Sequence, residues 1–79
     1  MIYIFLANGF EEIEALTPPD IFRRANLPTQ TVSIHESTTV MGAHNIPVIA
    51  DITLDKVNWA DADLLLLPGG MLGTKNLGA

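Results

Sequence analysis

Residues 7–25 of the chain read ANGFEEIEALTPPDIFRRA, a stretch that follows a short apolar run and indicates a turn leading into a helix. At about 100° per residue, a helix from Phe10 returns four side chains to one side. They are Ile13, Glu14, Thr17 and Ile21. The sequence therefore predicts that the Glu14 carboxylate lies within or beside the apolar stripe. There it would need hydrogen bonds, a charged partner or a raised pKa, or it would reach out to water at the margin of the stripe.

The remaining features of this helix concern its ends and its interruption. Glu11 and Glu12 are expected to project away from the stripe, towards the positive end of the helix dipole. Pro18-Pro19 predicts either a kink or a second helical segment capped by Thr17. Asn26 can adopt the left-handed conformation that ends a helix.

Apolar runs and alternation predict an α/β fold. Residues 2–6 are typical of a strand buried on both faces, and residues 31–35 alternate as a second strand, joined to the first by a helical crossover that suits a parallel pair. Residues 38–41 and 46–52 predict a hairpin laid over one edge of the sheet. Residues 63–67 predict a third buried strand.

Composition limits the classes of function. The 79 residues are 48% hydrophobic, which suits one domain or part of one, and they contain no cysteine. The net charge of −5 argues against nucleic acid or an anionic membrane as partner. No apolar run approaches about 18 residues, so we expect no membrane span. Because Met1 runs directly into the first strand without a leader, we expect a cytoplasmic protein.

Glycines after the third predicted strand offer a ligand site. Gly69 and Gly70 would follow the carboxyl end of a parallel strand, where backbone N–H groups can approach an oxyanion; the alternative is a simple tight turn. The spacing of a phosphate loop is absent, so nucleotide binding is a weak candidate. His35 and His44 are nine positions apart with no cysteine or carboxylate at ligand spacing, which favours structural or solvated roles over metal binding. We expect no cofactor and no metal.

Three segments in order carry a family resemblance: GFEEIEALTPPDIFRRA, VMGAHNIPVIAD and LLLLPGGMLGTKNL. They resemble the amino-terminal part of the ThiJ/PfpI superfamily, in the branch of the parkinsonism-associated deglycase and of proteins labelled as thiazole monophosphate biosynthesis enzymes. The resemblance covers nearly all 79 residues and implies one domain portion, residues 1–79, of a flavodoxin-like three-layer α/β sandwich with a mostly parallel sheet.

The resemblance also implies a homodimeric enzyme with a reactive cysteine on a strand-to-helix elbow. By motif position, Glu14 is the glutamate that hydrogen-bonds this cysteine, and the amides of Gly69 and Gly70 help to form the oxyanion site. Arg24 is similar to an arginine near the dimer interface and the site. The implied substrates are small reactive carbonyls or their adducts, by glyoxalase-like or deglycase-like chemistry.

The chain departs from the family pattern. Asn26 and Asn45 replace usual glycines, and Leu72 replaces a frequent proline; neither change alters the expected fold, because asparagine tolerates positive φ. The elbow cysteine and the histidine that follows it are not among the 79 residues, so we expect the chain alone to be catalytically inactive. Alternatives are a redox-responsive chaperone or interaction module, and a module that binds a small anion at residues 69–70.

Overall fold

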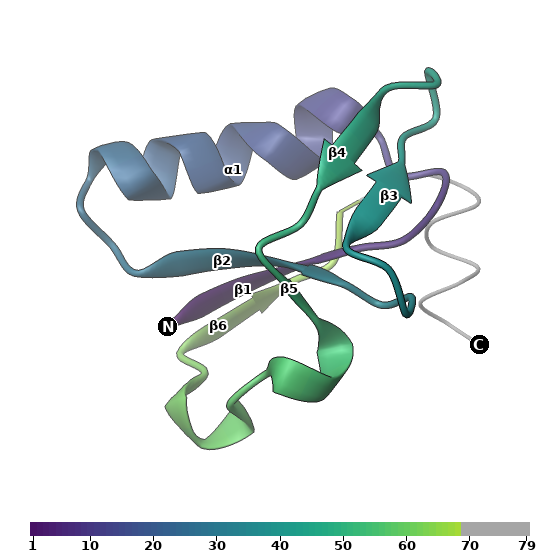
Figure 1. Cartoon of the computed structure of the whole chain (residues 1–79). Coiled ribbons are helices and arrows are strands. Elements are labelled where there is room, and N and C mark those ends of the chain that lie inside the picture. The colour runs from purple at the N-terminus through teal and green to yellow at the C-terminus, as the bar shows by residue number, and fades with distance from the viewer. Residues whose placement is uncertain (69–79) are drawn as a thin grey trace.

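A computed structural model describes residues 1–68 of the chain (Figure 1). Its elements, in order, are β1 (Ile2–Leu6), α1 (Glu12–Arg24), β2 (Thr29–Ser33), β3 (Thr39–Met41), β4 (Pro47–Ile49), β5 (Ile52–Thr53), short 3-10 helices at Leu54–Lys56 and Trp59–Asp61, and β6 (Leu64–Leu66). Within these residues, no helix is long and apolar enough to cross a membrane.

The main sheet has the strand order β5-β2-β1-β6, and every pairing in it is parallel. Strands β3 and β4 form a separate antiparallel pair. Figure 1 shows α1 on the same side of the sheet as this hairpin, with the 3-10 helices on the opposite side. The predicted α/β class, with its parallel β-α-β unit and its hairpin, is confirmed.

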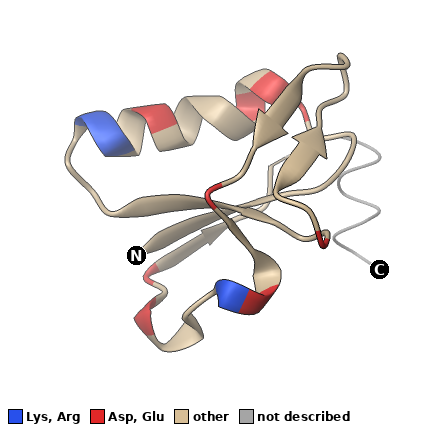
Figure 2. Ribbon diagram, in the orientation of Figure 1, with Lys and Arg blue, Asp and Glu red and all other residues tan. Residues whose placement is uncertain are grey.

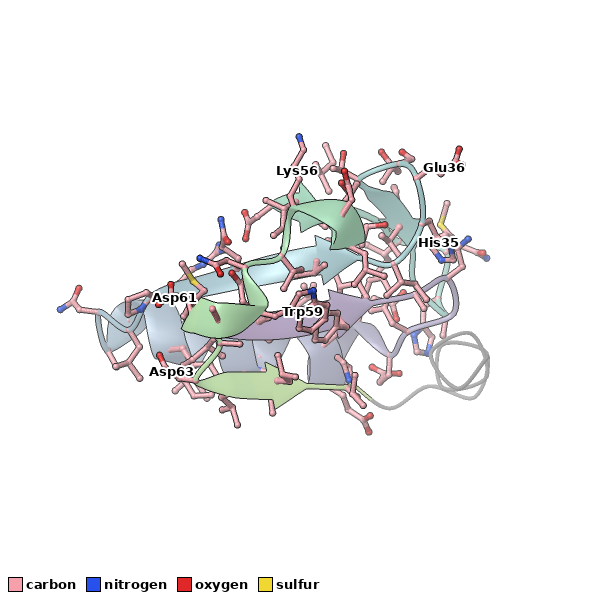
Figure 3. The ribbon with its side chains drawn as sticks, turned by 90° about the horizontal axis from the view of Figure 1, so that it is seen from below. His35, Glu36, Lys56, Trp59, Asp61 and Asp63 are labelled. Carbon is pink, nitrogen blue, oxygen red and sulfur yellow. The ribbon has the colours of Figure 1, made fainter. Side chains whose placement is uncertain are left out.

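Strand β1 supplies side chains to two hydrophobic clusters. Towards α1, Ile4 and Leu6 pack with Phe10, Ala15, Val40 and Ala50. On the other face, Tyr3 and Phe5 pack with Val32 and Val57. Trp59 stacks on Phe5, with ring centroids 5.9 Å apart, and Figure 3 shows it lying over the sheet from below. The prediction that the first strand is buried on both faces is therefore confirmed.

Helix α1 runs without interruption through Pro18 and Pro19. The alternative of a second segment capped by Thr17 is therefore wrong. The amino-terminal cap of the single helix is Glu11, whose side chain accepts a hydrogen bond from the Ile13 N–H. The helix is followed by Asn26 at φ 61°, the left-handed conformation predicted for it.

Two predicted strands have different limits in the structure. β2 begins two residues early, at Thr29, because pairing with β1 starts directly after Pro28, whose carbonyl accepts the Ile2 N–H at 2.8 Å. Predicted strand 46–52 divides into β4 and β5. Asp51 lies at the division, where its carboxylate accepts the Thr31 N–H at 2.8 Å and so guides the chain from the hairpin into the main sheet.

Strand β6 was expected to be buried, and this is wrong. Leu64 and Leu65 are 43% and 46% exposed, and the adjoining Leu67 is 66% exposed. The physical reason is that β6 is an edge strand, which pairs only with β1 within residues 1–68. The apolar composition of this strand fits a position inside a larger sheet.

We expect the isolated 79-residue chain to self-associate through this edge, because an exposed apolar strand edge is a template for pairing with another chain. Sedimentation velocity should show oligomers, and Leu65→Lys should shift the distribution towards monomer. A monodisperse wild-type monomer that unfolds cooperatively would contradict this expectation.

Candidate functional site

Glu14 lies in the first turn of α1, on its outer side. Its side chain is exposed, as are Ile13 and Ile21, which are 74% and 56% exposed. The predicted stripe is therefore wrong: it is the outward face of α1 in this structure. The buried residues of α1 are Glu12, Ala15 and Pro19. The face of α1 that meets the sheet carries Ala15, Pro19 and Phe22, and not the isoleucines on which the angular argument relied.

Glu12 is the buried carboxylate of this helix, only 6% exposed. As expected, it projects away from the side of the helix that carries Glu14, but this direction leads into the protein. The Glu12 Oε2 atom accepts the His44 backbone N–H at 2.8 Å, and Oε1 lies 2.6 Å from the His44 Nδ1 atom. Glu12 thus joins the start of α1 to the loop between β3 and β4.

The backbone beside Glu12 is tied to the same loop. The Gly9 N–H donates to the Met41 carbonyl at 2.8 Å, and the Ala43 N–H donates to the Phe10 carbonyl at 2.7 Å. Gly9 has φ 91°, a conformation that glycine adopts without strain. The turn after β1 and the β3–β4 loop therefore form one hydrogen-bonded unit.

The pair has shifted pKa values. Burial acts to raise the pKa of Glu12, but hydrogen bonds from the His44 side chain and backbone outweigh it, and the pKa falls to about 2. The hydrogen bond to Glu12, followed by the charges of Glu12 and Glu11, raises the pKa of His44 above its ordinary 6.5. The pair is therefore a carboxylate and an imidazolium over a wide pH range.

These shifts predict how the pair affects stability with pH. The contribution of Glu12 to folded-state stability is fully present above the ordinary pKa of 4.5 and is lost as pH falls towards 2. The contribution of His44 is fully present below its ordinary pKa of 6.5 and is lost as pH rises through the raised pKa. The melting temperature of wild type should exceed that of His44→Gln most clearly between pH 4.5 and 6.5. A difference that does not vary with pH would contradict this.

Gly42 provides the space for the Glu12 carboxylate. A Cβ atom on Gly42 would lie 2.2 Å from Glu12 Oε2 and 2.4 Å from Cδ. We expect Gly42→Ala to displace the carboxylate and break its bonds to His44. In nuclear magnetic resonance titrations, the His44 pKa should then fall towards that of an unpaired histidine. Ala43→Gly, which leaves this space open, is the control; an unchanged His44 pKa in Gly42→Ala would refute the expectation.

The other predicted site residues are placed less centrally. Arg24 is exposed and donates to the Asp20 carboxylate at 3.1 Å, while its place beside a dimer interface stays a prediction. Figure 2 shows the acidic start and basic end of α1. The predicted oxyanion residues, Gly69 and Gly70, lie outside the described residues. Because β6 is parallel to β1, it ends at the same edge of the sheet as the turn into α1.

His35 has the structural role expected of it, since its Nε2 atom accepts the Asn8 N–H at 3.0 Å.

His44 was missed as a site residue. Its partner Glu12 lies 32 positions away, so local spacing gave no signal. One clue was available: Glu12 lies three residues before the small residue Ala15 and therefore shares a helix face with it, which indicates that Glu12 faces inward.

Comparison with known proteins matches the DJ-1/PfpI family over residues 1–79. The Parkinson disease protein 7 homolog of Danio rerio is 32% identical over 75 residues, 94% of this chain and 40% of that protein. A DJ-1 superfamily protein from Salmonella typhimurium, solved with a cysteine replaced by alanine, is 42% identical with a TM-score of 0.91, covering 96% of this chain and 41% of that one. The oxidized DJ-1 of Toxoplasma gondii is 30% identical with a TM-score of 0.85, covering 90% and 39%.

The open parallel sheet with its helix, and the likeness to the Salmonella structure, place the chain in the flavodoxin-like class, as expected. The chain belongs to the DJ-1/PfpI family. It spans about two fifths of the length of the Danio and Salmonella relatives.

Proposed function

We propose that this chain is the amino-terminal part of a cysteine-dependent enzyme that acts on small reactive carbonyls or their protein adducts. The observation that carries the proposal is the open position of Glu14. Within residues 1–68, its exposed carboxylate makes no hydrogen bond or ion pair, although it lies in the first turn after β1. Such a carboxylate is free to serve a group supplied from elsewhere in the complete protein.

In the proposed mechanism, a cysteine thiolate adds to the carbonyl carbon of the substrate. Glu14 takes the thiol proton and returns it during the reaction, and amides at Gly69 and Gly70 bind the oxyanion. The 79 residues contain no cysteine, so the nucleophile comes from another part of the protein. The proposal of a nucleophilic cysteine is supported by the Salmonella relative, which has a cysteine that was replaced by alanine for its structure.

The proposed enzyme is a cytoplasmic homodimer that needs no cofactor and binds neither nucleic acid nor membrane. The exposed outer face of α1, with Ile13 and Ile21, supports an interface with a second subunit, beside which Arg24 would lie. The net charge of −5 supports the exclusion of nucleic acid.

The test is methylglyoxal consumption by the complete protein and by the 79-residue chain. We expect turnover only in the complete protein, and its loss when the elbow cysteine is replaced by alanine. Turnover that survives this replacement would refute the cysteine-dependent mechanism. Turnover by the 79-residue chain, well above buffer, would refute the division of the site between two parts of the protein.

A second candidate is a redox-responsive protective function without turnover. It is favoured by the Toxoplasma relative, whose structure is that of an oxidized form. Suppression of aggregation of a heat-denatured client protein distinguishes the two candidates. A complete protein that suppresses aggregation only with its cysteine intact, and that does not consume methylglyoxal, would favour the second.

A further inference from the structure

Three potential metal ligands converge where the turn after β1 meets the β3–β4 loop. The Glu11 and Glu12 carboxylates and the His44 imidazole each offer an atom, and these atoms lie within 4.8 Å of one another. The side chains of Glu12 and Glu11 are only 8% and 26% exposed, which separates them from ordinary surface acids. We propose that Glu11, Glu12 and His44 bind one divalent transition-metal ion such as Zn²⁺.

The two carboxylates are oriented for this role. Glu11 uses Oε1 to accept the Ile13 N–H at 2.9 Å, and Glu12 uses Oε2 to accept the His44 N–H at 2.8 Å. The second oxygen of each carboxylate, Oε2 of Glu11 and Oε1 of Glu12, is directed at the imidazole. Hydrogen bonds of this kind fix ligand orientation in known metal sites.

The two donor-atom distances that involve His44 are close to those expected in a metal site. Two ligands at tetrahedral angles around Zn²⁺ are about 3.3 Å apart, given metal–ligand bonds of about 2.0–2.1 Å. The His44 Nδ1 atom lies 3.6 Å from Glu11 Oε2 and 2.6 Å from Glu12 Oε1. The first distance already fits, and the second must lengthen as the ion replaces the proton between the imidazole and the carboxylate.

The donor set selects the class of ion. One imidazole and two carboxylates suit Zn²⁺ and its neighbours in the first transition series, whereas Ca²⁺ and Mg²⁺ prefer sites built from oxygen alone. Two carboxylates and a neutral imidazole also balance the charge of a divalent ion. The His44 side chain is 66% exposed, which leaves water access to a fourth position.

Binding would fasten the amino terminus of α1 to the β3–β4 loop, because the ligands come from segments 32 positions apart. An ion that binds the folded state and not the unfolded chain raises the melting temperature. The melting temperature does not depend on catalysis, so the metal site can be tested even if the proposed enzyme function is refuted.

The experiment titrates the complete protein with Zn²⁺ by calorimetry, after the elbow cysteine has been replaced by alanine to remove a competing thiolate. We expect one Zn²⁺ per chain at this site and a higher melting temperature. His44→Gln should weaken binding by at least the roughly 10- to 100-fold that loss of an outer-shell partner costs in known sites. His35→Gln, at the histidine bound to Asn8, is the matched control and should leave the affinity unchanged.

Co²⁺ absorption provides the second measurement, since its visible spectrum reports on the ligands. We expect a spectrum that changes in His44→Gln and in Glu11→Gln, a variant that keeps the buried Glu12. The proposal is overturned if Zn²⁺ does not bind, or if it binds His44→Gln as tightly as wild type. It is also overturned if Zn²⁺ binding leaves the melting temperature unchanged.

Discussion

Replacing Glu14 by glutamine in the complete protein should lower the rate of methylglyoxal turnover by about 10²–10⁴-fold, the range expected for loss of a general acid–base group. Glutamine keeps the size of the side chain and removes its ability to accept a proton. Because Glu14 is exposed in the structure, the substitution should leave the fold intact. The loss should therefore appear in catalysis and not in the circular dichroism spectrum.

Two comparisons make this expectation decisive. Glu36→Gln alters another exposed carboxylate, in the loop between β2 and β3, and should retain full turnover. In Glu14→Gln, the pH dependence of alkylation of the elbow cysteine should change, because the carboxylate proposed to accept the thiol proton is gone. Full turnover with an unaltered alkylation profile would remove Glu14 from the mechanism.

Replacing Phe10 by alanine should destabilise the protein by about 3–5 kcal/mol, the usual cost of truncating a buried phenylalanine. Phe10 is 1% exposed and packs with Ile4, Leu6 and Val40 in the cluster below α1. A globular domain gains only about 0.05–0.15 kcal/mol of stability per residue, so one such cavity consumes a large fraction of the total.

Urea unfolding of the complete protein, followed by circular dichroism, measures this effect. Phe10→Leu should lose less stability than Phe10→Ala, because leucine fills more of the cavity. Equal losses in the two variants, or a loss below about 1 kcal/mol in Phe10→Ala, would show that the side chain does not organise the cluster as its burial indicates.

The sequence was sufficient to predict the fold where a signal was local. The apolar run of β1, the parallel crossover and the hairpin were all expected, and Asn26 and Asn45 have the positive φ that their residue type permits. The limits of β2 were not predictable, because pairing with β1 and not alternation determines where the strand begins.

The candidate site was predictable only in part, because its geometry depends on long-range packing. Helical spacing shows which residues share a face, but it does not show which face meets the sheet. For this reason Glu14 was predicted as the inward carboxylate, whereas Glu12 is the buried one. The bond between Glu12 and His44 depends on where the hairpin folds back, which no spacing within α1 reports.

The central position of β1 has a consequence for folding during synthesis. Strand β1 pairs with β2 and with β6, and β6 is made about 60 residues after β1. The Met1 ammonium group donates to the Asp63 carboxylate at 2.6 Å, which joins two residues 62 positions apart in the sequence. The edge of β1 that pairs with β6 therefore stays unpaired until residues 64–66 have been made, and a chaperone that binds extended apolar segments would find this edge open in that interval.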